Sequence, residues 1–207
     1  FGSGIISPFV CGNSFTDTRD NKTYNTVLIG TQCWMAQNLN VGTKIDGTVA
    51  QSDNLTIEKY CYQNLESNCD VYGGLYTWNE WMNYTSSSNS NPSGRQGICP
   101  SGWHAPSDAE WCQLEQYLDN SISCSSTGYR GTVGGGMLKE SGTAHWKSPN
   151  TGASNSSGFT ALPGGYSDPA GPYGSLTTFG YYYTSTESST SNAWYRGLYY
   201  GSIQIER

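Results

Sequence analysis

The sequence predicts a single α+β domain in which two helices are followed by a long, irregular and aromatic β region. Three observations predict this arrangement: a helix start signal at Ser107, glycine-rich loops with short strand-like segments after Gly128, and a composition of 26 Gly, 16 Tyr and 7 Trp among 207 residues. That length suffices for one sizeable domain and is short for two. We expect an N-terminal tail over residues 1–13 and one domain over residues 14–207.

The first half of the chain carries a hairpin pattern and a helix pattern. Residues 17–30 place strand-forming side chains around Asp20-Asn21, a dipeptide typical of a turn, so we expect a β-hairpin there. Residues 73–84 repeat apolar side chains at helical spacing, and we expect a short helix.

The clearest helix signal lies just after Ser107. The Ser107 side chain can accept a hydrogen bond from the first turn, and Glu110, three residues later, can return one, which is the pattern of a capping box. We therefore expect a helix at 108–119. After Gly128 we expect no further helix, and the strand-like segments there are 159–162, 181–184 and 193–200.

Seven cysteines indicate disulfides in an oxidising compartment, because a chain with 35% apolar and 13% charged residues has only a modest core. No two of them form a C-x-x-C pair, so a zinc knuckle is not expected. Several connectivities are open. We expect Cys61–Cys69 and Cys112–Cys124, which close short loops, then Cys11–Cys33 by elimination, with Cys99 left over. Reduced thiols in a cytosolic protein are the alternative.

The charge distribution disfavours several functions. The net charge is −6 and the ten Lys and Arg residues form no cluster, so we expect no nucleic-acid partner. No apolar run reaches the ~18 residues of a transmembrane helix, so we expect no membrane insertion. Of the two histidines, His104 precedes the helix cap and is expected to be a structural hydrogen-bonding residue. Because no catalytic constellation is visible, we expect that the protein is not an enzyme.

Tyrosines gather near the C-terminus. Eight of the 16 lie between residues 166 and 204, among Ser, Thr, Asn and Gly. This mixture is typical of antibody binding sites, where tyrosine supplies amphipathic contact area and small polar residues adapt their hydrogen bonds. Strand alternation sends neighbours in Tyr181-Tyr182-Tyr183 to opposite faces, so these three cannot all be exposed together. The pattern predicts a binding surface, and a plain aromatic core is the alternative.

Five motifs in a fixed order carry a family resemblance. They are TVLIGTQCWMAQNLN (26–40), CYQNLESNCDVYGGLYTW (61–78), GICPSGWHAPSDAEW (97–111), FTALPGGY (159–166) and TSTESSTSNAW (184–194). Together they resemble the Fibrobacter succinogenes major paralogous domain over residues 16–202. The resemblance implies a C-type-lectin-like fold of the formylglycine-generating-enzyme type. It also implies an extracellular, cell-surface or virion-surface location.

Some proteins of this type are the variable proteins of diversity-generating retroelements, in which error-prone copying of adenines rewrites a C-terminal binding stretch. The resemblance therefore implies a non-catalytic binding protein for a protein or glycan on a partner cell or host surface. Rewriting the adenines of an asparagine codon gives Tyr, Ser or Arg but never Lys or Met, and neither occurs after Lys147. The expected variable positions are Tyr173, Tyr181, Tyr183, Ser188, Asn192, Tyr195, Arg196, Tyr199, Tyr200 and Ser202.

Alternatives stay open beside this hypothesis. A fixed-sequence adhesin or structural module would share the fold without any rewriting. An oxidase is disfavoured, because formylglycine-generating enzymes use two cysteines late in the domain and none follows Cys124 here. We expect no cofactor, with calcium at Asp168 or Glu187 as a minor alternative. Relatives continue with a Ser-Val-Arg-Cys-like ending where this chain has GSIQIER, which leaves the last strand and a partner for Cys99 open.

Overall fold

The computed structural model describes residues 9–168 and 171–207. Its helices are α1 (Glu66–Tyr72), α2 (Trp78–Trp81), α3 (Asp108–Leu118) and α4 (Gly134–Leu138), with a 3-10 turn at Tyr62–Asn64. Its strands are β1 (Phe15–Asp17), β2 (Lys22–Tyr24), β3 (Thr26–Ile29), β4 (Gln32–Met35), β5 (Thr43–Lys44), β6 (Glu58–Lys59), β7 (Tyr129–Arg130), β8 (Tyr166–Ser167), β9 (Tyr173–Gly174), β10 (Phe179–Ser189), β11 (Asn192–Tyr199) and β12 (Ile205–Glu206). In the described part of the chain, no helix has both the length and the apolarity to cross a membrane.

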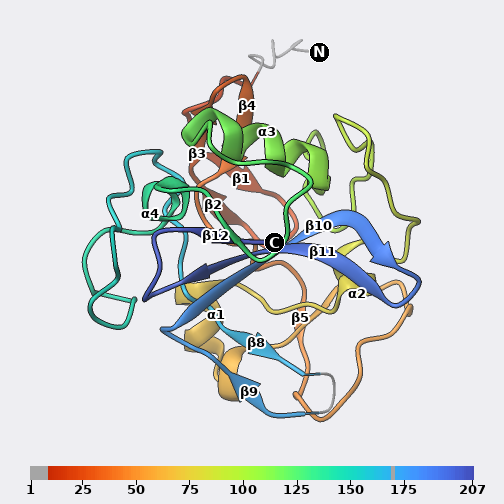
Figure 1. Ribbon diagram of the computed structural model, residues 1–207. Coiled ribbons are helices and arrows are strands. Elements are labelled where there is room, and N and C mark those ends of the chain that lie inside the picture. Colours follow the sequence, from red (N-terminus) through yellow and green to blue (C-terminus); the bar gives the residue numbers. More distant parts are fainter. Residues whose placement is uncertain (1–8, 169–170) are drawn as a thin grey trace, which may run out of the picture.

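The largest sheet has four strands in the order β10-β11-β12-β7, and every neighbouring pair is antiparallel. Figure 1 shows β10, β11 and β12 across the middle of the molecule, with α3 above them and α1, β8 and β9 below. Tyr and Thr, which favour strands, make up much of the β10–β11 hairpin. The predicted strands at 181–184 and 193–200 fall in this hairpin and are confirmed. The ending GSIQIER itself supplies β12.

The predicted turn at Asp20-Asn21 is confirmed, but the hairpin around it differs from the prediction for residues 17–30. Asn21 has a left-handed φ of 59°, and the turn joins β1 to β2. The next strand, β3, pairs forward with β4 in a second hairpin. Asn25 separates the two hairpins, because its carbonyl accepts from the Ala36 N–H at 2.9 Å rather than from β1.

The helix predicted at 108–119 is confirmed as α3, together with its capping box. The Ser107 hydroxyl accepts from the Glu110 N–H at 3.1 Å, and the Glu110 carboxylate accepts from the Ser107 N–H at 2.9 Å. The helix predicted at 73–84 is much shorter, since only Trp78–Trp81 are helical.

The expectation of only two helices, with none after Gly128, is wrong, because the described residues also form α1 and α4. The α4 segment holds three glycines in a row, a composition of low helix propensity. Its glycines are required by close packing, since a Cβ at Gly135 or Gly136 would run into backbone of Gln204 or Gly152. The strand predicted at 159–162 is also wrong, and only Ala161 forms an isolated bridge there.

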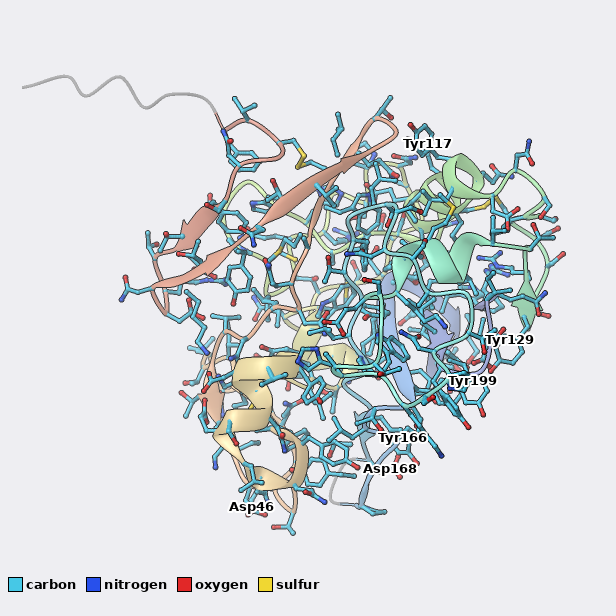
Figure 2. All side chains as sticks on the ribbon, turned by 90° about the vertical axis from the view of Figure 1, so that its left-hand side faces the viewer. Asp46, Tyr117, Tyr129, Tyr166, Asp168 and Tyr199 are labelled. Atoms are coloured by element: carbon cyan, nitrogen blue, oxygen red, sulfur yellow. A yellow bond between two sulfur atoms is a disulfide. The ribbon has the colours of Figure 1, made fainter. Side chains whose placement is uncertain are left out.

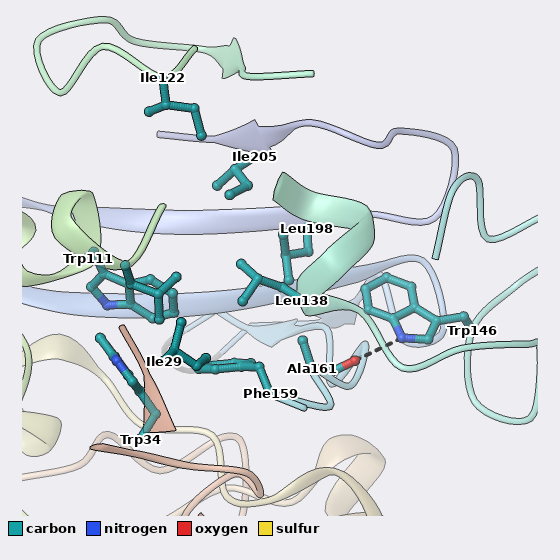
Figure 3. Packing of buried hydrophobic residues seen from close by; sticks show 11 residues of the cluster. Ile29, Trp34, Trp111, Ile122, Leu138, Trp146, Phe159, Ala161, Leu198 and Ile205 are labelled. Carbon is teal, nitrogen blue, oxygen red and sulfur yellow. Dashed lines mark hydrogen bonds between the residues drawn. The ribbon is translucent and has the colours of Figure 1, made fainter. Parts of the chain in front are cut away.

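The core lies between α3, α4, the inner side of the largest sheet and the β3–β4 hairpin (Figure 3). Its members are Ile29, Trp34, Trp111, Leu114, Ile122, Leu138, Trp146, Phe159, Ala161, Leu198 and Ile205. The rings of Trp34 and Trp111 are 4.9 Å apart, and Trp146 Nε1 donates to the Ala161 carbonyl at 2.9 Å. Aromatic rings bury large areas each, so they supply much of the core in a chain with few aliphatic residues.

Three disulfides are present and confirm the expected pairing: Cys11–Cys33, Cys61–Cys69 and Cys112–Cys124. Cys99 is free and buried. The first disulfide bonds residue 11 of the expected tail to β4, so that part of the tail is attached to the domain. Residues 1–8 of the expected tail lie outside the described residues.

Candidate functional site

Tyrosines gather on the outer side of the β10–β11 hairpin. In its register Tyr183 lies opposite Tyr195. Tyr181 and Tyr183 are each 38% exposed, whereas the Tyr182 hydroxyl points inward and donates to the Leu162 carbonyl at 3.0 Å. The prediction that these three consecutive tyrosines cannot share one face is confirmed.

We call this outer surface the aromatic face. It consists of Phe179, Tyr181, Tyr183, Tyr195 and Tyr199 from the hairpin and Tyr166 from β8. The Tyr181 ring lies 5.2 Å from Phe179 and 5.7 Å from Tyr195. It also lies 6.0 Å from Tyr166, and Phe179 lies 4.6 Å from Tyr199. These are stacking and edge distances, so neighbouring rings hold one another in place. Figure 2 shows Tyr199 and Tyr166 on the same side of the molecule.

A cleft of about 1010 Å³ runs along β10, the edge strand of the largest sheet, and residues 181–183 line it. Across from them, the Trp81 ring lies 6.1 Å from that of Tyr183. Two polar atoms of lining residues, Trp34 Nε1 and Gln32 Oε1, are buried without a hydrogen-bond partner among the described residues. The cleft thus offers a ligand aromatic walls, whereas these two polar atoms lie beneath its surface.

The charge beside the aromatic face comes from Glu206. The Tyr195 hydroxyl donates to Glu206 Oε1 at 3.3 Å. Burial, and then the Glu206 carboxylate, raise the pKa of Tyr181 to about 12, and the same two causes raise the pKa of Tyr195 and of Tyr129. All three phenols therefore stay protonated at neutral pH, and they surround a single carboxylate.

The structure brings four of the ten predicted positions together on the aromatic face: Tyr181, Tyr183, Tyr195 and Tyr199. Ser188 and Asn192 are exposed and lie where β10 turns into β11. Their place at the tip of the same hairpin puts them beyond the Tyr183–Tyr195 pair. A ligand large enough to pass beyond that pair would reach them.

Three predicted positions lie elsewhere. The Tyr173 hydroxyl donates to Asn64 Oδ1 at 2.7 Å, which attaches the ring to the 3-10 turn. Tyr200 packs against the core, and Lys147 Nζ lies 5.1 Å above its ring. Ser202 is half-buried in the turn after β11.

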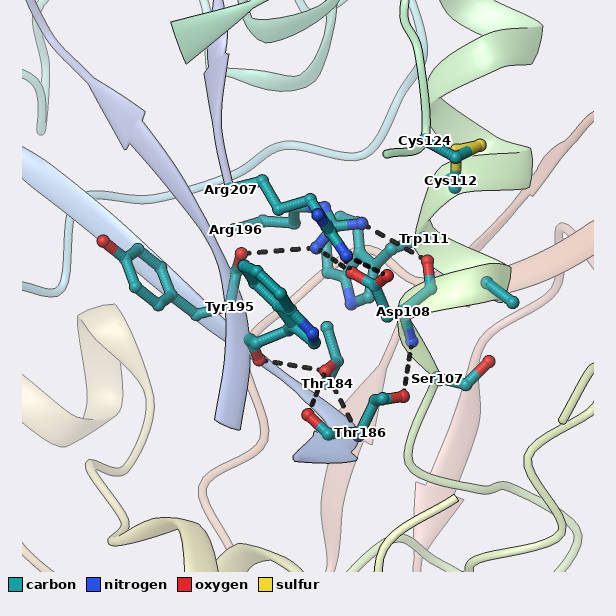
Figure 4. Close-up of polar contacts among 12 residues, drawn as sticks. Ser107, Asp108, Trp111, Cys112, Cys124, Thr184, Thr186, Tyr195, Arg196 and Arg207 are labelled. Carbon is teal, nitrogen blue, oxygen red and sulfur yellow. Dashed lines mark hydrogen bonds and ion pairs between the residues drawn. A yellow bond between two sulfur atoms is a disulfide. The ribbon is translucent and has the colours of Figure 1, made fainter. Parts of the chain in front are cut away.

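Arg196 lies in the interior, so the prediction that places it on the binding surface is wrong. Its side chain is fully buried and forms ion pairs with Glu115 and Asp108 of α3. Figure 4 shows Tyr195 pointing away from this network while Arg196 points into it. The cause is strand alternation, which sends Arg196 to the same side as the core residue Leu198.

The ten predicted positions do not include four residues that the structure places at or beside the aromatic face: Phe179, Tyr166, Tyr129 and Glu206. Phe179 could have been found, because it is two residues before Tyr181 and so shares its side of a strand. Tyr129 and Glu206 come from β7 and β12, and only the pairing of those strands brings them near the hairpin. No local sequence pattern predicts that pairing.

His104 is a hydrogen-bonding partner of the α3 cap, as expected from its place in the sequence. Its Nε2 lies 2.6 Å from Glu110 Oε1. This hydrogen bond raises the pKa of His104. Burial alone would raise the pKa of Glu110, but its hydrogen bonds to His104 and to the Ser107 N–H hold it below its ordinary value.

We predict that this pair makes stability depend on pH. A histidine with a raised pKa stabilises the fold fully below its unfolded pKa of 6.5, and this contribution is lost as pH rises through the folded pKa. The Glu110 carboxyl, whose pKa is lowered, stabilises the fold above its unfolded pKa of 4.5, and this contribution is lost as pH falls through the folded pKa. Since the His104 side chain is 39% exposed, the loss on going to pH 8 should stay below about 1 kcal/mol. Urea unfolding from pH 5 to pH 8 should show this slope in the wild type. A slope that persists unchanged in His104→Gln would contradict the assignment.

Within residues 9–168 and 171–207, no three His, Cys, Asp or Glu side chains are grouped so that they could hold a metal ion. The calcium alternative, which would also need backbone carbonyls, stays an untested prediction. In comparisons with known proteins, the family model described as the Fibrobacter succinogenes major domain matches residues 27–206. The comparisons with curated proteins and with solved structures gave no match.

Proposed function

Because the chain belongs to the Fibrobacter succinogenes major domain family, we propose that it is a non-catalytic ligand-binding protein that displays the aromatic face on a C-type-lectin-like fold. Its partner is a protein or glycan on another cell or host, met at a cell or virion surface. Three disulfides fit a protein that works outside the cell.

One observation carries the proposal: the β10–β11 hairpin separates binding groups from scaffold groups. Its outward side chains at Tyr181 and Tyr195 pack on each other, and Tyr183 faces Trp81. Its inward side chains at Tyr182 and Arg196 pack into the core and the ion pairs. Substitutions at the outward positions should therefore change the free energy of unfolding only slightly. Tyrosine suits such a surface, since it gives a large contact area with few rotatable bonds.

The same separation supports rewriting by a diversity-generating retroelement. Adenine replacement would then alter the outward positions and spare the inward ones. The test is to search the source genome beside this gene for a reverse transcriptase and an imperfect copy of the DNA for residues 166–204. We expect mismatches at adenines, at the codons for Tyr181 and Tyr195 and not at that for Arg196. Absence of both the copy and the transcriptase would favour a fixed-sequence adhesin.

We predict that outward and inward tyrosines differ sharply in their effect on stability. Tyr181→Ser and Tyr195→Ser should each lower the free energy of unfolding by less than about 3 kcal/mol, because both rings are at least partly exposed, whereas truncating a buried aromatic ring costs about 3–5 kcal/mol. The matched control is the adjacent inward residue: Tyr182→Ser opens a cavity beside Trp111 and should cost about 3–5 kcal/mol. Urea unfolding of the three variants measures this. Equal losses for all three would mean that the aromatic face is core.

A further inference from the structure

Four residues form one row across the outer side of the largest sheet. The register pairs Tyr181 with Gly197, Gly197 with Glu206, and Glu206 with Tyr129. Directly opposed residues in neighbouring strands project from the same side of a sheet. The row thus reads tyrosine, glycine, glutamate, tyrosine, with one residue from each of β10, β11, β12 and β7.

Glycine lets the carboxylate lie in the middle of this row. A Cβ at Gly197 would come within 2.8 Å of Glu206 Oε2 and 3.4 Å of the Tyr195 ring. The Glu206 side chain therefore leans over Gly197, with Tyr195 beside it. Tyr181 and Tyr129 close the two ends, and they are 38% and 44% exposed. Three phenol rings and one carboxylate therefore lie together on the outer side of the sheet.

Among the described residues, the Glu206 carboxylate has no cationic partner. No Lys, Arg or His of the described residues forms an ion pair with Glu206. Its neighbour Arg207 is engaged elsewhere, with Asp108 at 2.8 Å and with its guanidinium 3.7 Å from the Trp194 ring. In the described part of the chain, its one side-chain hydrogen bond is the long one that it accepts from the Tyr195 hydroxyl.

The geometry points to a cation-binding site formed by Tyr129, Tyr181, Tyr195 and Glu206, which takes the side chain of an exposed lysine on a partner protein. Ring faces attract a cation through their quadrupole, and a carboxylate among the rings adds charge pairing. Lysine fits because its apolar stem can lie on the rings while its ammonium reaches Glu206. The net charge of −6 favours the approach of such a partner. This inference rests on the proposed function and names the ligand group that the aromatic face selects.

The test uses two short peptides on the complete chain. Acetyl-Gly-Lys-Gly-amide is the probe, and acetyl-Gly-norleucine-Gly-amide keeps the stem but lacks the ammonium. NMR titration should show the lysine peptide shifting the amide resonances of Glu206 and Tyr129, with the norleucine peptide binding at least about fivefold more weakly. Affinity for the lysine peptide should fall between about 10 mM and about 1 M salt, because salt screens exposed charges.

Substitutions identify the groups that bind. Glu206→Gln keeps the shape and removes the charge, and it should weaken binding of the lysine peptide at least about fivefold; Tyr129→Leu should weaken it about two- to fivefold. The matched control is Glu187→Gln, an exposed carboxylate near the tip of the same hairpin, which should change nothing. Equal affinities for the two peptides, or no effect of Glu206→Gln, would overturn the cation site.

The outcomes for the two proposals can be told apart. If the lysine peptide binds through Glu206 but no imperfect gene copy exists, the cation site stands on a fixed-sequence surface. If tyrosines vary in gene copies but both peptides bind equally, the variable surface stands and recognises its partner by shape alone.

Discussion

Replacing Arg196 with methionine should lower the free energy of unfolding by about 3–5 kcal/mol, the cost of breaking a buried ion pair by removing one partner. Arg196 is fully buried, with Nε paired to Glu115 and Nη1 2.7 Å from Asp108. Glu115 also pairs with Arg130, and Asp108 with Arg207. Methionine fills the stem volume but cannot replace the hydrogen bonds that Arg196 donates to the two buried carboxylates, each of which then keeps a single arginine partner.

The network also links parts of the fold that share little else. Arg196 belongs to β11, Arg130 to β7, and both acids to α3, so one cluster fastens the helix across the largest sheet. Burial alone would raise the pKa of Asp108, but the hydrogen bonds and charges of Arg207 and Arg196 hold it below its ordinary value. Loss of one arginine therefore affects the attachment of α3 and not only one strand.

Urea unfolding of Arg196→Met and of Tyr195→Met gives the decisive comparison. The two residues are adjacent in β11 and point to opposite sides, so the control should cost about 1.5 kcal/mol or less. If Arg196→Met stays within about 1 kcal/mol of the wild type, the network contributes little. Arg196 would then be free to vary in sequence after all.

Elements of the fold could be predicted from the sequence where the interactions that form them lie between residues close together in the chain. The α3 helix was predictable because Ser107 and Glu110 cap it within one turn. The three disulfides were predictable because two of them close short loops. By contrast, α4 depends on glycines that let distant backbone approach, which no local rule detects.

The candidate site shows the same division. Alternation predicted that Tyr181, Tyr182 and Tyr183 cannot all face one side, and the same rule would have placed Arg196 inside with Leu198. Sequence analysis places Arg196 on the surface because rewriting the adenines of an asparagine codon can give arginine, whereas the structure pairs it with Glu115 and Asp108 in the interior. Glu206 joined the site only through the pairing of β12 with β11, a contact set by the whole sheet.

Replacing Lys139 with methionine should cause the second large loss of unfolding free energy, about 3 kcal/mol. The carbonyls of Thr151 and Ser202 would lose this donor at a cost of about 1–3 kcal/mol each, whereas the Tyr199 carbonyl keeps the Ser202 N–H. Lys139 is fully buried at the end of α4. Its Nζ donates to the carbonyls of Thr151, Tyr199 and Ser202 at 3.0, 3.1 and 2.8 Å. One ammonium thus joins α4 to a loop and to the end of β11.

The pH dependence of this loss tests the burial directly. Burial lowers the pKa of Lys139 from 10.5 to about 8. Between these values the unfolded chain keeps a proton that the folded chain has released, so the contribution of Lys139 to the unfolding free energy rises with pH. The difference in unfolding free energy between wild type and Lys139→Met should therefore grow from pH 7.5 to pH 9.5. Subtracting the variant cancels the tyrosine titrations that both proteins share. A difference that stays constant with pH would mean that the three carbonyls stabilise the ammonium as well as water does, so that its pKa is not lowered. A difference below about 1 kcal/mol at every pH would mean that water takes over the hydrogen bonds of the ammonium in the variant.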